Sequence, residues 1–166
     1  QRLARQTDPG AILETVTVAL KDNGPDNAIL FKEFRYSFRS HEDCAERQIR
    51  RLCSFDIVLD PAAESLSVTA AEREFDQAAN ADEWTTLAAR APLEPLAFDP
   101  WMRDLDTVLP AARATFARAA SNQATLDSAS LYLENRRLCW QVVAWTDDDQ
   151  PLFVVLDARS GAVLNP

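Results

Sequence analysis

The closing stretch "LCWQVVAWTDDDQPLFVVLDARSGAVLNP" (Leu138–Pro166) decides the predicted fold class. In 138–145 and 152–157 the side chains alternate with period two, which is typical of strands. The acidic run Asp147–Asp149, followed by Gln-Pro, predicts a tight turn between the two strands. Gly161 predicts a last turn that needs a positive φ. The stretch is therefore expected to form an antiparallel hairpin with a small closing turn.

Upstream of this hairpin the apolar spacing changes from strand to helix. Apolar residues fall on one helical face at Leu105, Val108, Leu109, Ala112 and Phe116. Pro110 is tolerable only near a first turn, so the helix is expected to begin close to it. Leu131 and Leu133 restore period two, and Asn135-Arg136 can turn. One helix followed by a three-stranded meander is an α+β unit.

The first half also shows strand patterns, in residues 15–20, 34–39, 55–59 and 66–68. A competing interpretation makes Asp8-Pro9 the start of a helix, with Ile12, Leu13, Val16 and Leu20 on one face. The strand is favoured by a small margin. The segment before Phe55 is expected to be a loop with a helical turn.

The sequence divides into three expected units. They are a β-rich half at 1–71, a helical connector with a proline-rich linker at 72–103, and a helix plus β-meander at 104–166. The expected fold class is α+β, with antiparallel sheets and helices packed on one face.

The last unit resembles the PepSY-like module, which has a strand with an early aromatic residue, a polar turn and a V-x-V/L-D-A-x-x-G-x-V ending. The matching residues are Trp140, Val142, Val154, Leu156, Asp157, Ala158, Gly161 and Val163. The resemblance implies a PepSY-like, cystatin-like unit over 104–166, without catalytic residues, in secreted, periplasmic or membrane-anchored bacterial proteins. The first half has no D-A-x-x-G ending; whether it is a diverged second copy stays open.

The charge narrows the class of partner. The chain has a formal net charge of −9, and residues 72–166 carry fifteen acids and eight bases. Such a surface disfavours nucleic acid and anionic lipid. The simpler interpretation of the charge is solubility, and the alternative is that it steers a basic protein partner. No apolar run is long enough to span a membrane. The start at Gln1 is compatible with a removed targeting segment or a trimmed sequence.

The cysteines suggest a compartment. Cys44 and Cys53 close a short loop and are expected to form a disulfide in an oxidising environment. The alternative is two free thiols, because one straight helix over 43–53 would hold the Cα atoms about 13 Å apart. Cys139 is expected to be a small buried apolar residue.

The sequence shows no arrangement for catalysis. His41 is the single histidine, and neither a nucleophile nor an orienting acid is placed for it. His41 to Cys44 lacks the spacing of a zinc site, and Asp147–Asp149 lacks the spaced ligands of a calcium loop. We expect no enzyme activity, no metal and no cofactor.

The expected function is therefore protein binding outside the cytoplasm, in the periplasm or as a secreted protein. Its most concrete form is an inhibitor or immunity-type protein against a secreted or envelope hydrolase. The alternatives are an envelope assembly component, lipid-anchored ahead of Gln1, and a small-ligand binder of the cone-shaped α+β type. The expected partner-binding residues are Asp147, Asp148, Asp149, Trp145 and Trp101.

Overall fold

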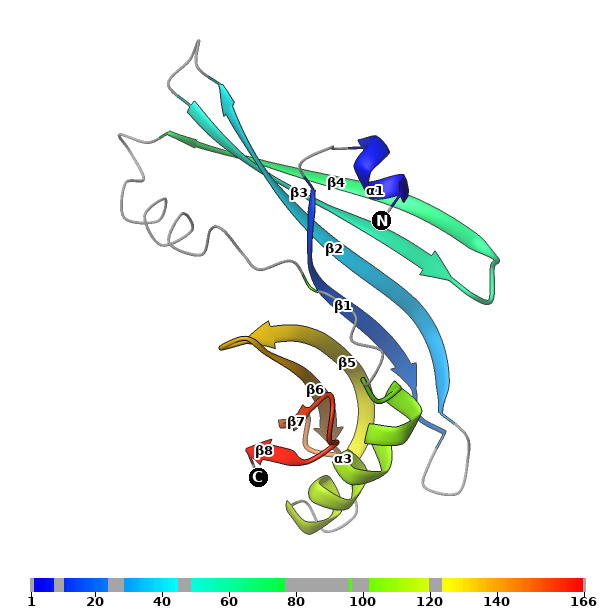
Figure 1. Ribbon diagram of the computed structural model, residues 1–166. Coiled ribbons are helices and arrows are strands. Elements are labelled where there is room, and N and C mark those ends of the chain that lie inside the picture. The colour runs from blue at the N-terminus through cyan, green and yellow to red at the C-terminus, as the bar shows by residue number, and fades with distance from the viewer. Residues whose placement is uncertain are drawn as a thin grey trace.

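The computed structural model describes residues 2–7, 11–23, 29–44, 49–76, 96, 102–119 and 124–165. Its described strands form one antiparallel sheet in the order β4-β3-β2-β1-β5-β6-β7-β8 (Figure 1). The first four strands are β1 Ile12–Lys21, β2 Leu30–Cys44, β3 Ile49–Asp60 and β4 Ser65–Asp76. The last four are β5 Ala124–Glu134, β6 Arg137–Thr146, β7 Pro151–Asp157 and β8 Val163–Asn165.

Two helices are described, α1 Arg2–Thr7 and α3 Leu105–Ala119. Helix α3 lies against β5, β6 and β7. It buries the expected stripe of Leu105, Val108, Leu109, Ala112 and Phe116. It begins five residues before Pro110 rather than close to it, and Pro110 lies inside the helix on an exposed position.

The expected α+β class, with helices packed on one face, is wrong. The molecule is mainly one large antiparallel sheet, and within the described residues α3 is the one helix of several turns. Residues 72–76, the start of the expected helical connector, form the end of β4, paired with β3, and the proline-rich linker, apart from Leu96, lies outside the described residues. Tertiary pairing has overridden local propensity there. The expected unit boundary at residue 71 also falls inside β4.

The expected loop before Phe55 is strand as well. Strands β2 and β3 continue past it, and their register sets Glu42 opposite Arg51 and Asp43 opposite Arg50. The strand preferred for the first segment is confirmed by β1, and the Asn135-Arg136 turn by positive φ angles of 49° and 64°.

The two halves of the chain share one sheet because β1 pairs with β5. The residues Thr17 and Ser130 face each other in this ladder, and their side-chain oxygens lie 3.0 Å apart. Buried residues on both sides of the junction belong to one hydrophobic core. The junction is therefore an internal sheet contact, not a linker between separate bodies.

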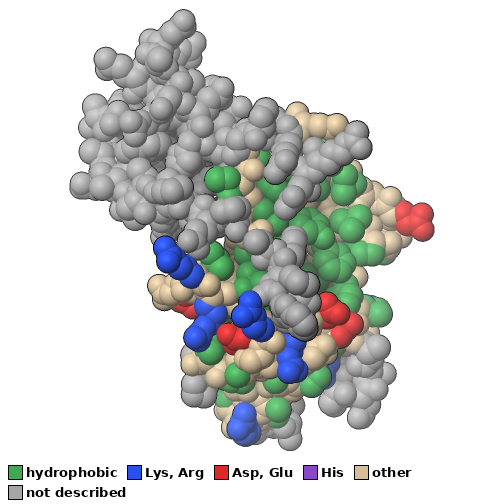
Figure 2. All heavy atoms as spheres, viewed as in Figure 1, with side chains coloured by type: hydrophobic (Ala, Val, Ile, Leu, Met, Phe, Trp, Pro, Cys, Tyr) green, Lys and Arg blue, Asp and Glu red, His purple; other side chains and the backbone are tan. Residues whose placement is uncertain are grey.

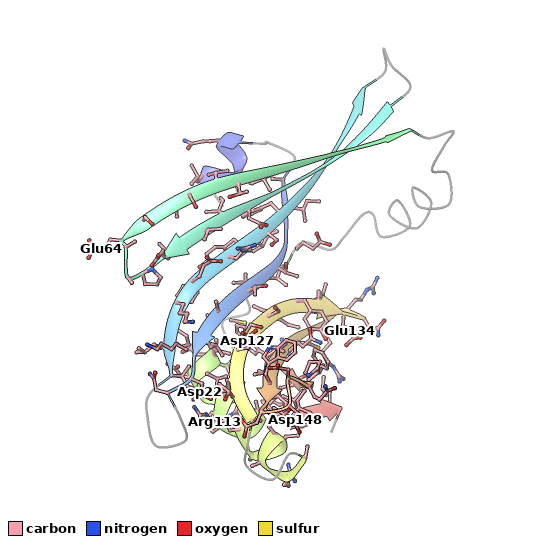
Figure 3. All side chains as sticks on the ribbon, turned by 180° about the vertical axis from the view of Figure 1, so that it is seen from behind. Asp22, Glu64, Arg113, Asp127, Glu134 and Asp148 are labelled. Atoms are coloured by element: carbon pink, nitrogen blue, oxygen red, sulfur yellow. The ribbon has the colours of Figure 1, made fainter. Side chains whose placement is uncertain are left out.

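A buried carboxylate ties α3 to this junction (Figure 3). Asp22, just after β1, has a side chain only 3% exposed. One oxygen accepts a hydrogen bond from Arg113 of α3 at 2.5 Å, and the other accepts the backbone N–H of Leu126 in β5 at 3.0 Å. One side chain thus joins β1, α3 and β5.

The two four-stranded meanders repeat each other. We call β1–β4 with α1 the N-terminal repeat, and β5–β8 with α3 the C-terminal repeat. The first strand of each carries a bulge at an acidic residue, Glu14 in β1 and Asp127 in β5. Counting from the bulges, the registers make these positions equivalent: Phe34 and Trp140, Leu59 and Leu156, Leu66 and Val163.

The turn after the third strand has the same geometry in both repeats. The carboxylates of Asp60 and Asp157 each accept the backbone N–H groups two and three residues further along, at 2.7–3.0 Å. Four residues after each aspartate φ is positive, 50° at Glu64 and 74° at Gly161. The first half therefore forms the same turn as the PepSY-like ending, and Glu64 occupies the position that Gly161 has in the second half.

Candidate functional site

The two tryptophans of β6 lie on opposite faces of the sheet, because an odd number of residues separates them along one strand. Trp140 is 5% exposed, and its indole N–H donates to the Arg103 carbonyl at 3.2 Å. Trp145 is 41% exposed. It lies on the face opposite α3, which we call the outer face. Trp140 is thus a core residue, whereas Trp145 is available to a partner.

Apolar side chains gather around Trp145 on the outer face of the β6–β7 hairpin. The ladder pairs Trp145 with Pro151 and Val143 with Phe153. Phe153 is 54% exposed, and it is a diagonal neighbour of Trp145, which places the two within reach of each other. We call Val143, Trp145, Pro151 and Phe153 the outer patch. Sequence reasoning missed Phe153, because both faces of β7 carry apolar residues.

The predicted acidic turn connects the same two strands. Asp147, Asp148 and Asp149 are exposed, and Asp148 lies at the hairpin tip (Figure 3). The turn is closed by backbone hydrogen bonds of 3.0 Å between Thr146 and Gln150 and from Asp149 to Thr146. Asp149 has a φ of 56°, a conformation that aspartate tolerates better than most residues. Asp149 therefore shapes the turn, whereas Asp147 and Asp148 add charge beside the outer patch.

The N-terminal repeat is polar where the outer patch is apolar. The register equivalents of Val143, Trp145 and Phe153 are Ser37, Arg39 and Asp56. On that outer face Arg35 forms ion pairs with Glu33 at 3.0 Å and with Asp56 at 3.6 Å. The fold does not require apolar residues at these positions. Trp101, the other expected anchor, lies outside the described residues.

The residues that resemble the PepSY-like ending hold α3 in place. The backbone N–H of Arg103 donates to the Ala158 carbonyl at 2.8 Å, and the Arg103 side chain lies over Gly161. A Cβ at Gly161 would come within 3.3 Å of that side chain, and φ there is positive. Ala158 is fully buried. These residues have structural contacts that fix the start of α3.

Three titratable groups line up across β5, β6 and β7. Tyr132, Cys139 and Asp157 are register partners. Burial first, and then Glu134, raise the pKa of the Tyr132 hydroxyl. Burial, followed by Glu134 and Asp157, raises the pKa of the Cys139 thiol, which suits an inert buried cysteine. Hydrogen bonds from Ser160, led by its backbone N–H, lower the pKa of Asp157.

The expected disulfide disagrees with the β2–β3 register. Cys44 lies opposite Ile49, and Cys53 lies opposite Ser40. Four residues along a ladder separate the two cysteines by about 13 Å, against a disulfide limit of about 7 Å between Cα atoms. His41 sits in the same ladder, opposite Leu52.

Across the described ranges, no three His, Cys, Asp or Glu side chains converge as a metal site would require. Within the same part of the chain, no helix combines the length and apolarity needed to cross a membrane.

No protein-family model and no curated protein matches the sequence. Among solved structures, the chain is similar to one from Clostridium difficile 630 described as a "putative lipoprotein", with a TM-score of 0.54 and 10% identity. The alignment covers 99% of this chain and 86% of that one. The 12:0-ACP thioesterase from Umbellularia californica aligns with a TM-score of 0.24 at 8% identity, over 92% of this chain and 71% of that one. The first likeness shows a shared fold; the second carries no argument.

Proposed function

We propose that this chain is a non-catalytic protein-binding module that works outside the cytoplasm, and that the outer patch with its acidic turn faces the partner. The observation that carries the proposal is the exposure of Trp145 and Phe153 at positions where the N-terminal repeat has Arg39 and Asp56. Exposing large apolar side chains costs solubility, so their presence at these equivalent positions in the C-terminal repeat alone favours a binding role there.

The chemistry of the patch favours a basic protein as partner. Tryptophan is enriched among the residues that dominate protein interfaces, and an aromatic ring can also receive an arginine or lysine side chain. Asp147 and Asp148, at the adjoining hairpin tip, supply negative charge that speeds encounter with a basic surface. The most concrete form is an inhibitor or immunity-type protein that binds a basic secreted or envelope hydrolase.

A second candidate is an envelope component attached through a lipid. The observation that favours it is the similar structure, which is described as a "putative lipoprotein". Both candidates share an extracytoplasmic location and a partner protein. They differ in whether binding changes the activity of a hydrolase.

The test is capture of envelope proteins on the immobilised full chain, quantified by mass spectrometry. The double variant Trp145→Ser, Phe153→Ser should lose the retained partner. Leu30→Ser should keep it, because Leu30 is also exposed, at 52%, but lies on β2. If both variants retain the partner equally, the outer patch is not the binding site. With a partner in hand, slower association of the Asp147, Asp148, Asp149→Asn variant at low salt tests the acidic turn.

A further inference from the structure

The N-terminal repeat exposes apolar side chains on the face of the sheet where α3 lies in the C-terminal repeat. Leu66 is 56% exposed and Val68 is 44% exposed, and Phe34, Tyr36 and Leu59 beside them are only half-buried. We call these five residues the open face. Figure 2 shows hydrophobic side chains gathered on this side of the molecule, next to the β3–β4 turn. The open face lies on the side of the sheet opposite to the outer patch.

The equivalent positions of the C-terminal repeat are covered. Trp140, the equivalent of Phe34, is 5% exposed, and Leu156, the equivalent of Leu59, is fully buried. Val163, the equivalent of Leu66, packs against the core. Helix α3 lies over this area. One helix therefore accounts for the difference in burial between the two repeats.

In the N-terminal repeat, helix α1 corresponds only to the C-terminal end of α3. Each helix is followed by four residues and then by the first strand of its repeat. This spacing matches α1 with the last turns of α3, and α3 is nine residues longer. Ala4 of α1 is 1% exposed, and Leu3 packs partly against the core. The open face continues from this interface, beside α1 (Figure 1).

We propose that the open face binds an amphipathic helix of a partner protein, seated in line with α1 where residues 105–113 lie in the other repeat. The expected sequence pattern of the partner helix follows from α3. Its apolar side chains cover the equivalent strands of the C-terminal repeat, at Leu105, Val108, Leu109 and Ala112. The partner helix needs apolar residues at the same spacing, which is how helices are recognised in apolar grooves. This site is separate from the outer patch and does not depend on it.

The probe is a fluorescein-labelled, end-capped peptide with the sequence of residues 104–119, which includes the helix that covers the equivalent strands of the C-terminal repeat. Fluorescence anisotropy with the full-length chain should show saturable binding. Leu66→Glu with Val68→Glu should weaken binding by roughly tenfold or more, since it places two charges against apolar side chains. The matched control is Ser67→Glu with Thr69→Glu, which makes the same charge change on neighbouring exposed positions of β4. It should change the affinity for the peptide by less than about twofold.

Three outcomes would overturn the proposal. The peptide could fail to saturate, or both double variants could bind it equally. Sedimentation could instead show that the chain self-associates and that Leu66→Glu with Val68→Glu abolishes this, in which case a second copy covers the face. Circular dichroism of each variant checks folding; Leu66 and Val68 are exposed, so both proteins should fold.

Discussion

Replacing Asp22 by alanine should be among the most destabilising single changes in the described core. The Asp22 carboxylate is almost fully buried and holds both the Arg113 guanidinium and the Leu126 N–H. Alanine leaves these two donors without that acceptor. The loss should loosen α3 from the β1–β5 junction.

The size of the effect follows from the burial of the two partners. Breaking a buried ion pair by removing one partner costs about 3–5 kcal/mol. The Arg113 side chain is 26% exposed and can turn toward solvent. We therefore expect Asp22→Ala to lower the free energy of unfolding by about 2–4 kcal/mol. In a chain of this length that lowers Tm by roughly 5–15 °C. Asp22→Asn should fall between alanine and wild type, because the amide oxygen can still accept from Leu126.

Urea and thermal unfolding, followed by circular dichroism, measure both quantities. The matched control is Asp127→Ala, which removes an exposed carboxylate from the residue after Leu126 (Figure 3). It should change the free energy of unfolding by less than about 0.5 kcal/mol. If Asp22→Ala costs no more than Asp127→Ala, the buried carboxylate does not hold α3, and the reasoning fails.

Other predictions concern single positions. Glu64→Gly should raise stability by up to about 1 kcal/mol in urea unfolding, because glycine adopts the positive φ without strain; a loss would contradict this. The pKa of Asp157 is lowered in the folded protein, so the stability that its carboxylate contributes is present above about pH 4 and is lost as pH falls through the folded pKa. Asp157→Asn should therefore be less stable than wild type at neutral pH, and its free energy of unfolding should fall less steeply as pH is lowered. Thiol titration of the unreduced, unfolded chain should count Cys44 and Cys53 as free together with Cys139, and a count of one would contradict the ladder register. In the native protein Cys139 should react far more slowly than after unfolding.

Local pattern predicted the elements whose two faces differ. Val16 and Val18 alternate with polar neighbours, and β1 forms there. The odd spacing of Trp140 and Trp145 predicts that at most one of them faces the core, and Trp140 is buried whereas Trp145 is exposed. The same rule failed for β7, where Phe153 lies between apolar neighbours. A strand that is apolar on both faces does not show by its pattern which face is exposed.

Long-range pairing was the part that the sequence did not reveal. The hydrogen-bonded pair Thr17 and Ser130 marks the β1–β5 junction, yet neither residue differs from an ordinary exposed strand position in sequence. Residues 72–76 are expected to begin a helical connector, but they pair with β3 as the end of β4. Pairing energy of this kind depends on the neighbouring strand and overrides local preference. The internal repeat was obscured for a related reason, because Glu64 replaces the glycine that marks the second copy.

The most direct test of the proposed binding function is crosslinking from the outer patch. A photo-crosslinking amino acid is placed at Phe153 and, in a second protein, at the equivalent Asp56 of the N-terminal repeat; both are outer-face positions. After irradiation with the envelope fraction, the account predicts one dominant protein crosslinked from position 153 and none of it from position 56, with the yield from 153 reduced when Trp145 is changed to serine. The same proteins crosslinked with equal yield from both positions would contradict the account.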